Sequence, residues 1–387
     1  MPVLNRIAAF AEEMKQWRRH LHQYPELSYD CHETARFIAD RLAEFGVDEI
    51  HTGIAQSGIV AIINGTGEGP AIGLRADMDA LPITETTGAE HASRVPGKMH
   101  ACGHDGHVTM LLGAAKYLAE TRRFAGRVAL IFQPAEEEGA GGRAMVQAGV
   151  MDRFGITQVY GIHNEPNMPF GHIMTNPGAL MASVDTAEVT ITGRGGHGAM
   201  PHECIDPVVA LVGMVGAVQT ILSRNVHALD EAVISVTMVH AGSASNIIPD
   251  EARFTATIRC FSPQVRELLK RRFHEIVEGH GAAYGVQTRI AYDWGYPATV
   301  NHPDQTRFAT HVAAEVVGAE AVDDNCERKA WSEDFSYMLE ERPGCYLYLG
   351  TGPGAGLHHS AFDFNDEAAP IGASFFARLV ERAQPLA

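Results

Sequence analysis

Short apolar runs alternate with stretches of helical periodicity over residues 1–180. Four of these runs are rich in Val, Ile and Leu without a clean apolar–polar alternation, which is typical of strands buried on both faces. They are Ile59–Ile63, Ala71–Arg75, Arg127–Phe132 and Val159–Ile162. A helix is predicted from Asp105, as its N-cap, to about Ala119, because apolar residues there recur on one helical face. This order of elements predicts an α/β domain with a largely parallel sheet.

The pattern changes near residue 181. Asp185–Gly193 alternates like a half-buried strand, and Asp206-Pro207 then begins a long helix to about Arg224, with Asp as the N-cap. A second helix is predicted from Ser262-Pro263 to about Tyr284. The remaining strands of this region are Ala232–Val239, Glu251–Cys260 and Gln287–Trp294. Strand, helix, strand, strand, helix, strand is the order of a ferredoxin-like unit.

A short apolar run like those of the first region occurs again at Tyr346–Leu349, which predicts another buried strand. Ala368–Gln384 is predicted to be the C-terminal helix. We therefore expect residues 1–180 and 296–387 to form one discontinuous α/β domain. Residues 181–295 would form a ferredoxin-like α+β domain inserted into it.

Composition narrows the possible partners of this 387-residue chain. Its formal charge of −17 would repel a phosphate backbone, so neither nucleic acid nor an anionic membrane is expected to be a partner. Met1–Trp17 is amphipathic and has no continuous apolar core, which predicts a helix rather than a signal peptide. The six cysteines are scattered without any Cys-x-x-Cys pair, which favours a reducing cytoplasm.

The segment His100–His107 holds the first candidate chemistry. Cys102 and His104 lie two residues apart on a Gly-containing turn that enters a helix. A thiolate and an imidazole so placed can bind one metal ion; zinc suits both, and imidazole also suits manganese, cobalt or nickel. The alternative is a helix N-terminus that is rich in histidine by accident.

Further carboxylates and imidazoles follow the predicted strands. In an open α/β sheet, ligands gather beyond the carboxyl ends of the strands. The residues at those ends are Asp77 and Asp79, Glu136 to Glu138, His163, and the pair His358-His359. Each alone has a plainer explanation, such as a turn, a solvated loop or a core histidine. Because four strands deliver such groups to one edge, the joint pattern predicts a metal site.

Two other classes of protein remain open at this point. A cysteine hydrolase would use Cys102 as its nucleophile, but such an enzyme does not require the carboxylate pair and the later histidines. The second alternative is a non-catalytic metal-binding or ligand-binding protein of the same fold. Such a protein would have no use for a general base, so a glutamate placed beside the ligands, as Glu136 is, counts against it. Chelation would separate the first alternative, because it should leave a thiol hydrolase active.

Eight segments of the chain together resemble the bacterial hippurate hydrolases and the plant hydrolases of indole-acetyl-amino acids, within the aminoacylase and carboxypeptidase G superfamily of metallopeptidases. The match runs in the same order from about residue 15 to the last helix, so it covers nearly the whole chain. They are Arg75–Pro82, Met99–His107, Phe132–Glu137, Gly161–Asn164, Gly195–Gly198, Ser245–Pro249, Ser332–Phe335 and Leu357–His358.

The resemblance implies two divalent metal ions, zinc, manganese, cobalt or nickel, with a bridging cysteine. The implied ligands are Cys102, His104, Glu137, His163 and His358. Glu136 would be the general base. The chain departs from the family pattern at two places, Glu138 and the pair His359-Ser360. The register of the three glutamates and the choice between His358 and His359 therefore stay open.

The inserted domain is implied to be a lid and a dimerisation surface, giving a homodimer or homotetramer. His197 matches a histidine that reaches substrate, in related enzymes from the partner subunit, and Asn246 and Arg259 match positions that hold the substrate carboxylate. Asp79 and Glu333 would orient ligands or add negative charge.

The implied activity is hydrolysis of the amide bond of N-acyl amino acids, of the hippurate or N-acetyl type. The closest alternative is a dipeptidase or a deacylase of diaminopimelate derivatives in the same superfamily.

Overall fold

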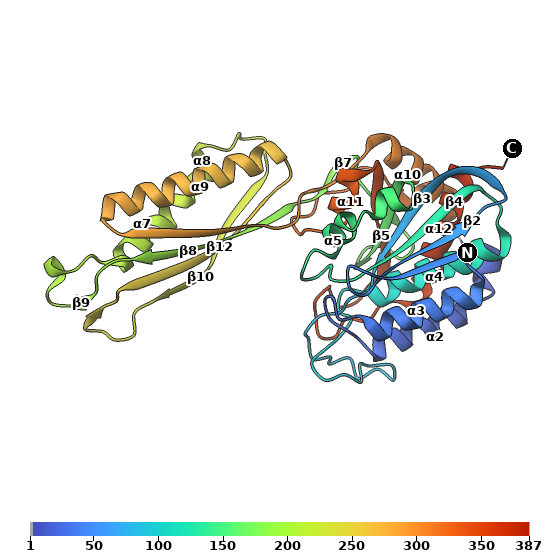
Figure 1. Ribbon diagram of the computed structural model, residues 1–387, viewed down its shortest axis with the longest axis horizontal. Coiled ribbons are helices and arrows are strands. Elements are labelled where there is room, and N and C mark those ends of the chain that lie inside the picture. The colour runs from blue at the N-terminus through green and yellow to red at the C-terminus, as the bar shows by residue number, and fades with distance from the viewer. Residues whose placement is uncertain (1–2, 387) are drawn as a thin grey trace. The chain divides into compact units, whose positions relative to one another are not determined.

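The computed structural model describes residues 3–386, and these form two compact units (Figure 1). The large unit contains the chain up to Leu180 together with Val300–Glu327 and the residues from Asp334 onward. The small unit contains Met181–Thr299 and Arg328–Glu333.

An eight-stranded sheet lies at the centre of the large unit, in the order β1-β2-β4-β3-β5-β16-β6-β15. The four strands from β4 to β16 are parallel to one another, whereas β1, β2 and β6 run antiparallel to neighbours. The bounds are β1 Glu49–Ile54, β2 Gly58–Asn64, β3 Gly67–Asp77, β4 Ala125–Gln133, β5 Ile156–Pro166, β6 Ile173–Met174, β15 Val322–Asp323 and β16 Gly344–Gly352. The predicted α/β class with a mostly parallel sheet is confirmed.

The helices of the large unit bury the sheet. α2, α3, α4 and α12 pack against one another, and their apolar side chains share one core with the strands. The helix bounds are α1 Asn5–Ala8, α2 Ala11–Gln23, α3 His32–Phe45, α4 His104–Thr121, α5 Gly141–Gln147, α6 Val150–Arg153, α10 Pro303–Val317, α11 Ser336–Glu341 and α12 Ala369–Ala383. The predicted N-terminal helix is two helices, α1 and α2, and its first two residues lie outside the described range.

The predicted N-cap of α4 is wrong. Gly103, in the left-handed region at φ 91°, takes that position, and no side chain caps the helix. Asp105 lies one residue inside the helix, fully buried, and its carboxylate accepts a hydrogen bond from His22 at 2.8 Å. One carboxylate oxygen is therefore bound to α2, while the other accepts the Gly106 N–H within the first turn of α4 at 3.0 Å.

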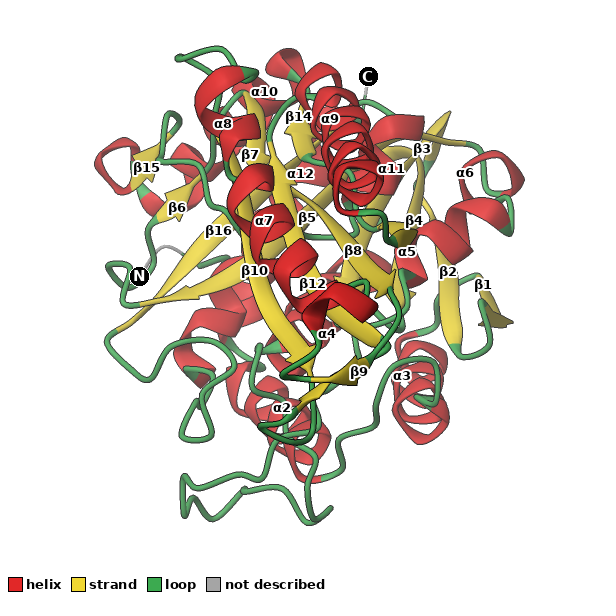
Figure 2. Cartoon of the chain, turned by 90° about the vertical axis from the view of Figure 1, so that its left-hand side faces the viewer, coloured by secondary structure: helices red, strands yellow, loops and turns green. Residues whose placement is uncertain are grey.

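The small unit is a four-stranded antiparallel sheet in the order β10-β12-β8-β13, with two long helices on one face (Figure 2). Asp206 caps the first helix by accepting from the Val208 amide at 2.8 Å, as predicted. That helix does not continue unbroken to Arg224, because α8 begins separately after Gln219. The bounds are β8 Ser183–Thr192, α7 Pro207–Val218, α8 Thr220–Arg224, β10 Ala232–Ala241, β12 Glu251–Cys260, α9 Pro263–Tyr284 and β13 Gln287–Trp294.

Short elements complete the chain. They are β7 Gly178–Met181, β9 Gly196–His197, β11 Ile247–Ile248, β14 Thr299–Asn301, and the 3-10 helices Pro201–Glu203, Ala319–Ala321 and Asp366–Ala368. Among the described residues, the stretch Pro207–Arg224 is apolar and long enough to cross a membrane by composition alone. Its residues Ala210, Leu211 and Met214 are buried in the core of the small unit, which accounts for part of that apolar character.

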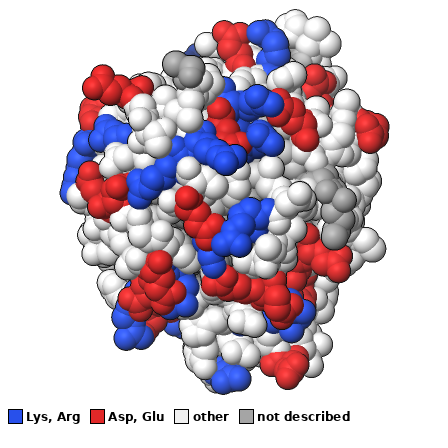
Figure 3. Space-filling model, turned by 90° about the vertical axis from the view of Figure 1, so that its right-hand side faces the viewer, with Lys and Arg blue, Asp and Glu red and all other residues white. Residues whose placement is uncertain are grey.

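Surface charge is mixed on the face of the large unit that Figure 3 shows, where cationic and acidic side chains adjoin. Several of the cations of the large unit are paired, as in Arg6 with Glu120 at 2.8 Å and Arg382 with Glu315 at 2.9 Å.

Candidate metal centre

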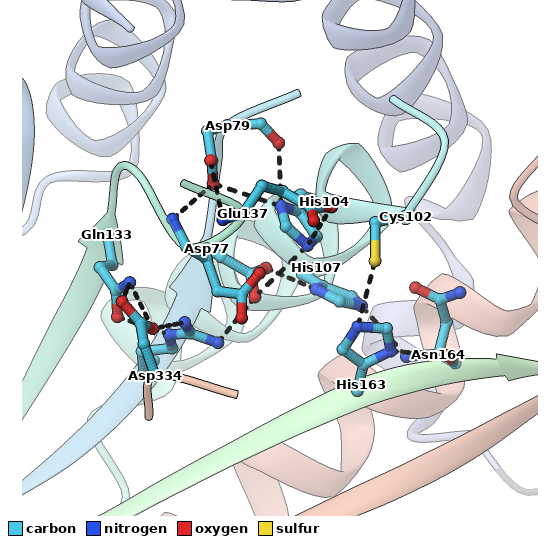
Figure 4. Close-up of polar contacts among 12 residues, drawn as sticks. Asp77, Asp79, Cys102, His104, His107, Gln133, Glu137, His163, Asn164 and Asp334 are labelled. Carbon is cyan, nitrogen blue, oxygen red and sulfur yellow. Dashed lines mark hydrogen bonds and ion pairs between the residues drawn. The ribbon is translucent and has the colours of Figure 1, made fainter. Parts of the chain in front are cut away.

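Five segments meet at the carboxyl edge of the parallel strands, and Figure 4 labels site residues from β3, β5, the start of α4 and the segment after β4. β3 ends at Asp77, β5 carries His163, and α4 begins at His104. After β4, the chain turns sharply at Ala135, whose φ of 56° is unusual for a residue other than glycine. This turn directs the following glutamates back toward the end of β3. The fifth segment, after β16, brings His358.

Among the groups of possible metal ligands that these segments form, two share Cys102. Cys102, His104 and His163 make one group, and Cys102, Glu137 and His358 make the other; the ligand atoms in each lie within 4.8 Å of one another. Both groups contain Cys102, so its sulfur would be shared if each group held one ion. Sulfur, imidazole nitrogen and carboxylate oxygen are the donors that divalent first-row cations bind in proteins.

The two buried histidines of the first group have the same orientation. His104 donates Nδ1–H to the carbonyl of Asp79 at 2.8 Å, and His163 donates Nδ1–H to the carbonyl of Asn164 at 2.7 Å. Each Nε2 is thereby left to face a metal ion, which would displace any proton that this nitrogen holds. The His104 Nε2 is buried without a hydrogen-bond partner, and the His163 Nε2 lies 3.5 Å from the Cys102 sulfur. A backbone carbonyl that fixes one ring nitrogen while the other faces a metal is common in metal sites.

Asp79 anchors the glutamate turn. Its two carboxylate oxygens accept the backbone N–H groups of Glu136 at 3.1 Å and Glu137 at 3.2 Å. Glu136 is buried and Glu137 nearly so, whereas Glu138 is exposed. Only the first two glutamates therefore face the ligand groups.

His358 and His359 also differ. The Nε2 of His358 lies 3.3 Å from Glu137, and its backbone N–H bonds to Ala101 although φ is 60°. The ring of His359 instead accepts the backbone N–H of Ala361 at 3.0 Å. A strained backbone held in place by its surroundings is typical of functional positions.

The electrostatics of the site favour cations. Burial raises the pKa of the Cys102 thiol well above its ordinary value, and Glu137 and Glu136 raise it further. Although burial lowers the pKa of His104, Asp77 and the other nearby carboxylates outweigh this and raise it to about 10. Without a cation the cluster therefore holds protons on sulfur and imidazole. The Glu137 Oε1, like the His104 Nε2, is buried without a hydrogen-bond partner. The residues present thus fit divalent metal ions.

A buried arginine lies behind the cluster. Arg75 donates to Asp77 at 2.7 Å, to Asp334 at 2.9 Å and to Gln133 at 2.9 Å. Asp334 also accepts the Gly142 N–H at 2.7 Å, so it ties the start of α5 to the sheet. The sequence motifs contained Arg75 and Asp334, but no spacing rule connected residues so far apart.

The other predicted site residues belong to the small unit. His197 and Asn246 lie on neighbouring segments, since β9 pairs with β11 and the Gly198 N–H bonds to the Asn246 carbonyl at 2.8 Å. Arg259 lies near the opposite end of β12 and donates to the Ala330 carbonyl at 3.0 Å. Glu333 is buried, and its carbonyl accepts from Thr299. The small unit therefore separates Arg259 from His197 and Asn246.

A largely buried set of sulfur, nitrogen and oxygen donors, with the exposed His358 at its edge and a further carboxylate beside it at the carboxyl edge of an α/β sheet, defines a metal-dependent hydrolase. The chain belongs to peptidase family M20/M25/M40, whose model matches residues 73–382. This confirms the superfamily that the sequence motifs indicated.

Individual relatives are similar over nearly their whole length. An N-acetylcysteine deacetylase of Bacillus subtilis is 38% identical over 372 residues, which are 96% of this chain and 97% of that protein. A hippurate hydrolase of Campylobacter jejuni is 37% identical over 382 residues, 98% of each chain. A crystal structure of a dinuclear metal binding peptidase from Bacillus subtilis superposes with a TM-score of 0.85 at 35% identity, covering 97% of this chain and 99% of that one.

Proposed function

We propose that this hydrolase cleaves the amide bond of N-acyl amino acids, releasing a carboxylic acid and a free amino acid. The relatives named above act on N-acetylcysteine and on hippurate, which are both N-acyl amino acids with a free carboxylate. The observation that carries the proposal is the placement of Glu136. Its carboxylate lies within 4.8 Å of the ligand atoms of His104 and Glu137, where a general base would be needed.

Cys102, His104, Glu137, His163 and His358 would hold two divalent ions, zinc, manganese, cobalt or nickel. When bound, such ions lower the pKa of water and polarise a carbonyl group. Glu136 would take a proton from the attacking water and return it to the leaving amine. Asp79 would hold the backbone of both glutamates in place through their N–H groups.

Arg259 would bind the substrate carboxylate. Its guanidinium forms no ion pair among residues 3–386, and burial lowers its pKa, so an incoming carboxylate would supply the missing partner. Asn246 and His197 are also proposed to contact substrate. They lie on segments next to β11, just before β12 begins at Glu251, whereas Arg259 lies eight positions further along β12, about 27 Å at the spacing of an extended strand. One small unit therefore does not offer both groups to one substrate, which favours His197 and Asn246 acting from a partner subunit.

The small unit offers a surface for that partner. β10 is an edge strand, and its Val233, Met238 and Val239 are exposed. On the adjoining α7, Val209 and Val212 are 53% and 66% exposed. Exposed edge strands pair readily with another chain, and an apolar patch beside one is typical of an interface. We propose a homodimer in which two β10 strands meet, or a tetramer built from that dimer.

We also propose that the protein works in a reducing cytoplasm, where Cys102 stays reduced and available to metal.

The glutamate roles are tested with three matched variants, Glu136→Gln, Glu137→Gln and the exposed control Glu138→Gln. Turnover of hippurate and N-acetylcysteine and metal content per chain are measured together. We expect Glu136→Gln to lose about 10² to 10⁴-fold in turnover while keeping its metal, because proton transfer alone is removed. Glu137→Gln should lose metal, and Glu138→Gln should change neither. Loss of metal from Glu136→Gln would show that the two roles are exchanged.

The partner role is tested by mixing two inactive proteins, Glu136→Gln and His197→Ala. If His197 acts across the dimer, subunit exchange should restore activity in the mixed dimer, because one of its two sites then contains both intact residues. No recovery after proven exchange would mean that each chain uses its own His197.

A further inference from the structure

Another group of possible ligands lies next to those that contain Cys102. Asp77, His104 and His107 are all buried, and their ligand atoms lie within 4.8 Å of one another. His104 and His107 are one turn apart at the start of α4, so their rings come from the same part of the helix. By residue type alone, His107 is as good a metal ligand as His104.

The hydrogen bonds of His107 exclude that role. Its Nε2 faces the backbone N–H of Asn164 at 3.0 Å, and a backbone N–H can only donate, so this nitrogen must be the acceptor. The ring proton is then on Nδ1, which donates to the Asp77 carboxylate at 2.5 Å. A neutral imidazole with one nitrogen donating and the other accepting has no lone pair left for a cation.

Asp77 is engaged in the same way. One oxygen accepts from His107, and the other accepts from Arg75 at 2.7 Å. The guanidinium of Arg75, buried beside it, would also repel a cation at this position. This contrasts with His104 and His163, whose Nδ1 atoms bind carbonyls and whose Nε2 atoms accept no backbone N–H and stay open to a metal ion.

We infer that His107 is a positioning residue that joins Asp77 at the end of β3 to the peptide between His163 and Asn164 on β5. The carbonyl of the same Asn164 accepts Nδ1–H of His163 at 2.7 Å. His107 therefore holds the backbone that orients the His163 ring toward Cys102. The inference rests on the proposed role of His163 as a metal ligand.

Two substitutions divide the contacts of His107. In His107→Gln, the amide oxygen falls near the former Nε2 and keeps an acceptor for Asn164. In His107→Asn, the amide nitrogen falls near the former Nδ1 and keeps the bond to Asp77 but loses the one to Asn164. Metal content, metal affinity and the visible spectrum of the cobalt-loaded protein are measured for both, with His163→Ala as the control for a lost ligand. Thermal unfolding of the metal-free proteins checks that each variant folds.

We expect both variants to bind two ions per chain. His107→Asn should bind metal about 10 to 100-fold more weakly, the usual effect of removing a group that orients a ligand, and its cobalt spectrum should change. His107→Gln should keep the wild-type spectrum and lose less affinity. Loss of one ion from folded His107→Gln, or no difference between the two variants, would overturn the inference. If His163→Ala still bound two ions with the wild-type spectrum, the proposed ligand set itself would fail instead.

A measurement on the wild-type protein tests, without any substitution, whether His107 binds the metal. In cadmium-loaded protein with nitrogen-labelled histidine, only ring nitrogens that bind the metal show cadmium–nitrogen coupling in the NMR spectrum. The ring nitrogens of His104 and His163 should be coupled and those of His107 should not. Coupling at His107 would overturn the inference.

Discussion

The buried ionic cluster around His22 predicts a specific pH dependence of stability. His22 is fully buried on α2, with Nδ1 2.8 Å from Asp105 and Nε2 3.4 Å from Glu85. Burial lowers the pKa of His22, but the two carboxylates outweigh it and raise the pKa from 6.5 to about 9. The folded large unit therefore holds His22 as a cation at neutral pH.

The raised pKa of His22 makes the large unit less stable as the pH rises. Because the folded pKa of His22 is raised, the folded state binds a proton that the unfolded chain releases between about pH 6.5 and pH 9. The stabilisation is complete below pH 6.5 and is lost as the pH rises through 9. At about 1.4 kcal/mol per pH unit, the interval corresponds to about 3 kcal/mol in the free energy of unfolding.

The assay compares wild type with His22→Gln, which keeps an amide in place of the ring but does not titrate. Of the three tryptophans only Trp17 lies in the large unit, so replacing Trp294 and Trp331 by Phe in both proteins makes fluorescence report that unit alone. Urea unfolding is followed at about pH 6 and about pH 9.5 in the presence of chelator, which removes any pH dependence of metal binding.

Between these pH values the free energy of unfolding of wild type should fall by about 3 kcal/mol more than that of His22→Gln. The difference between the two proteins removes the contribution of all other titrating groups. Equal pH dependence of the two proteins would refute the reasoning, because His22 would then not be charged in the folded state.

Three further predictions concern other parts of the chain. Gly103→Ala should lose metal and cost about 3 kcal/mol or more in unfolding measurements, because φ is 91° and a Cβ would lie 2.2 Å from the Asn164 Oδ1; full metal content would contradict this. Arg266→Leu should destabilise the small unit by about 3 to 5 kcal/mol in calorimetry, because Asp185, 1% exposed, loses its paired guanidinium; an unchanged transition would refute it. Arg259→Leu should raise KM for N-acyl amino acids but not for amides without a carboxylate, and an equal effect on both would remove its proposed role.

The sequence predicted the fold and the edge of the sheet where the site lies, because apolar periodicity and strand order are local properties. It did not predict the role of Asp105, since a carboxylate at a helix start can cap the helix or pair elsewhere, and His22 decides this from 83 residues away. The hydrogen bond from Arg75 to Asp334 joins residues 259 positions apart and could not be predicted from the sequence either. Such pairings depend on which side chains the finished fold brings together.

The three consecutive glutamates show a different limit of sequence. Glu136, Glu137 and Glu138 are chemically identical, so no property of the residues themselves orders them. In the structure the left-handed turn at Ala135 and the two bonds to Asp79 orient the first two toward the cluster and leave the third exposed. Backbone conformation thus selects among equal side chains.

Twenty histidines make the same point for metal binding. His104 and His107 share a helix turn, a buried environment and a contact with Asp77, yet only the Nε2 of His104 is left open to a metal ion. What separates them is the partner of the second nitrogen, a carbonyl for His104 and a backbone N–H for His107. A carbonyl can only accept and therefore frees the far nitrogen for metal, whereas an N–H occupies it. The distinction between a ligand and a positioning histidine thus depends on the backbone that faces the ring, and spacing in the sequence cannot supply it.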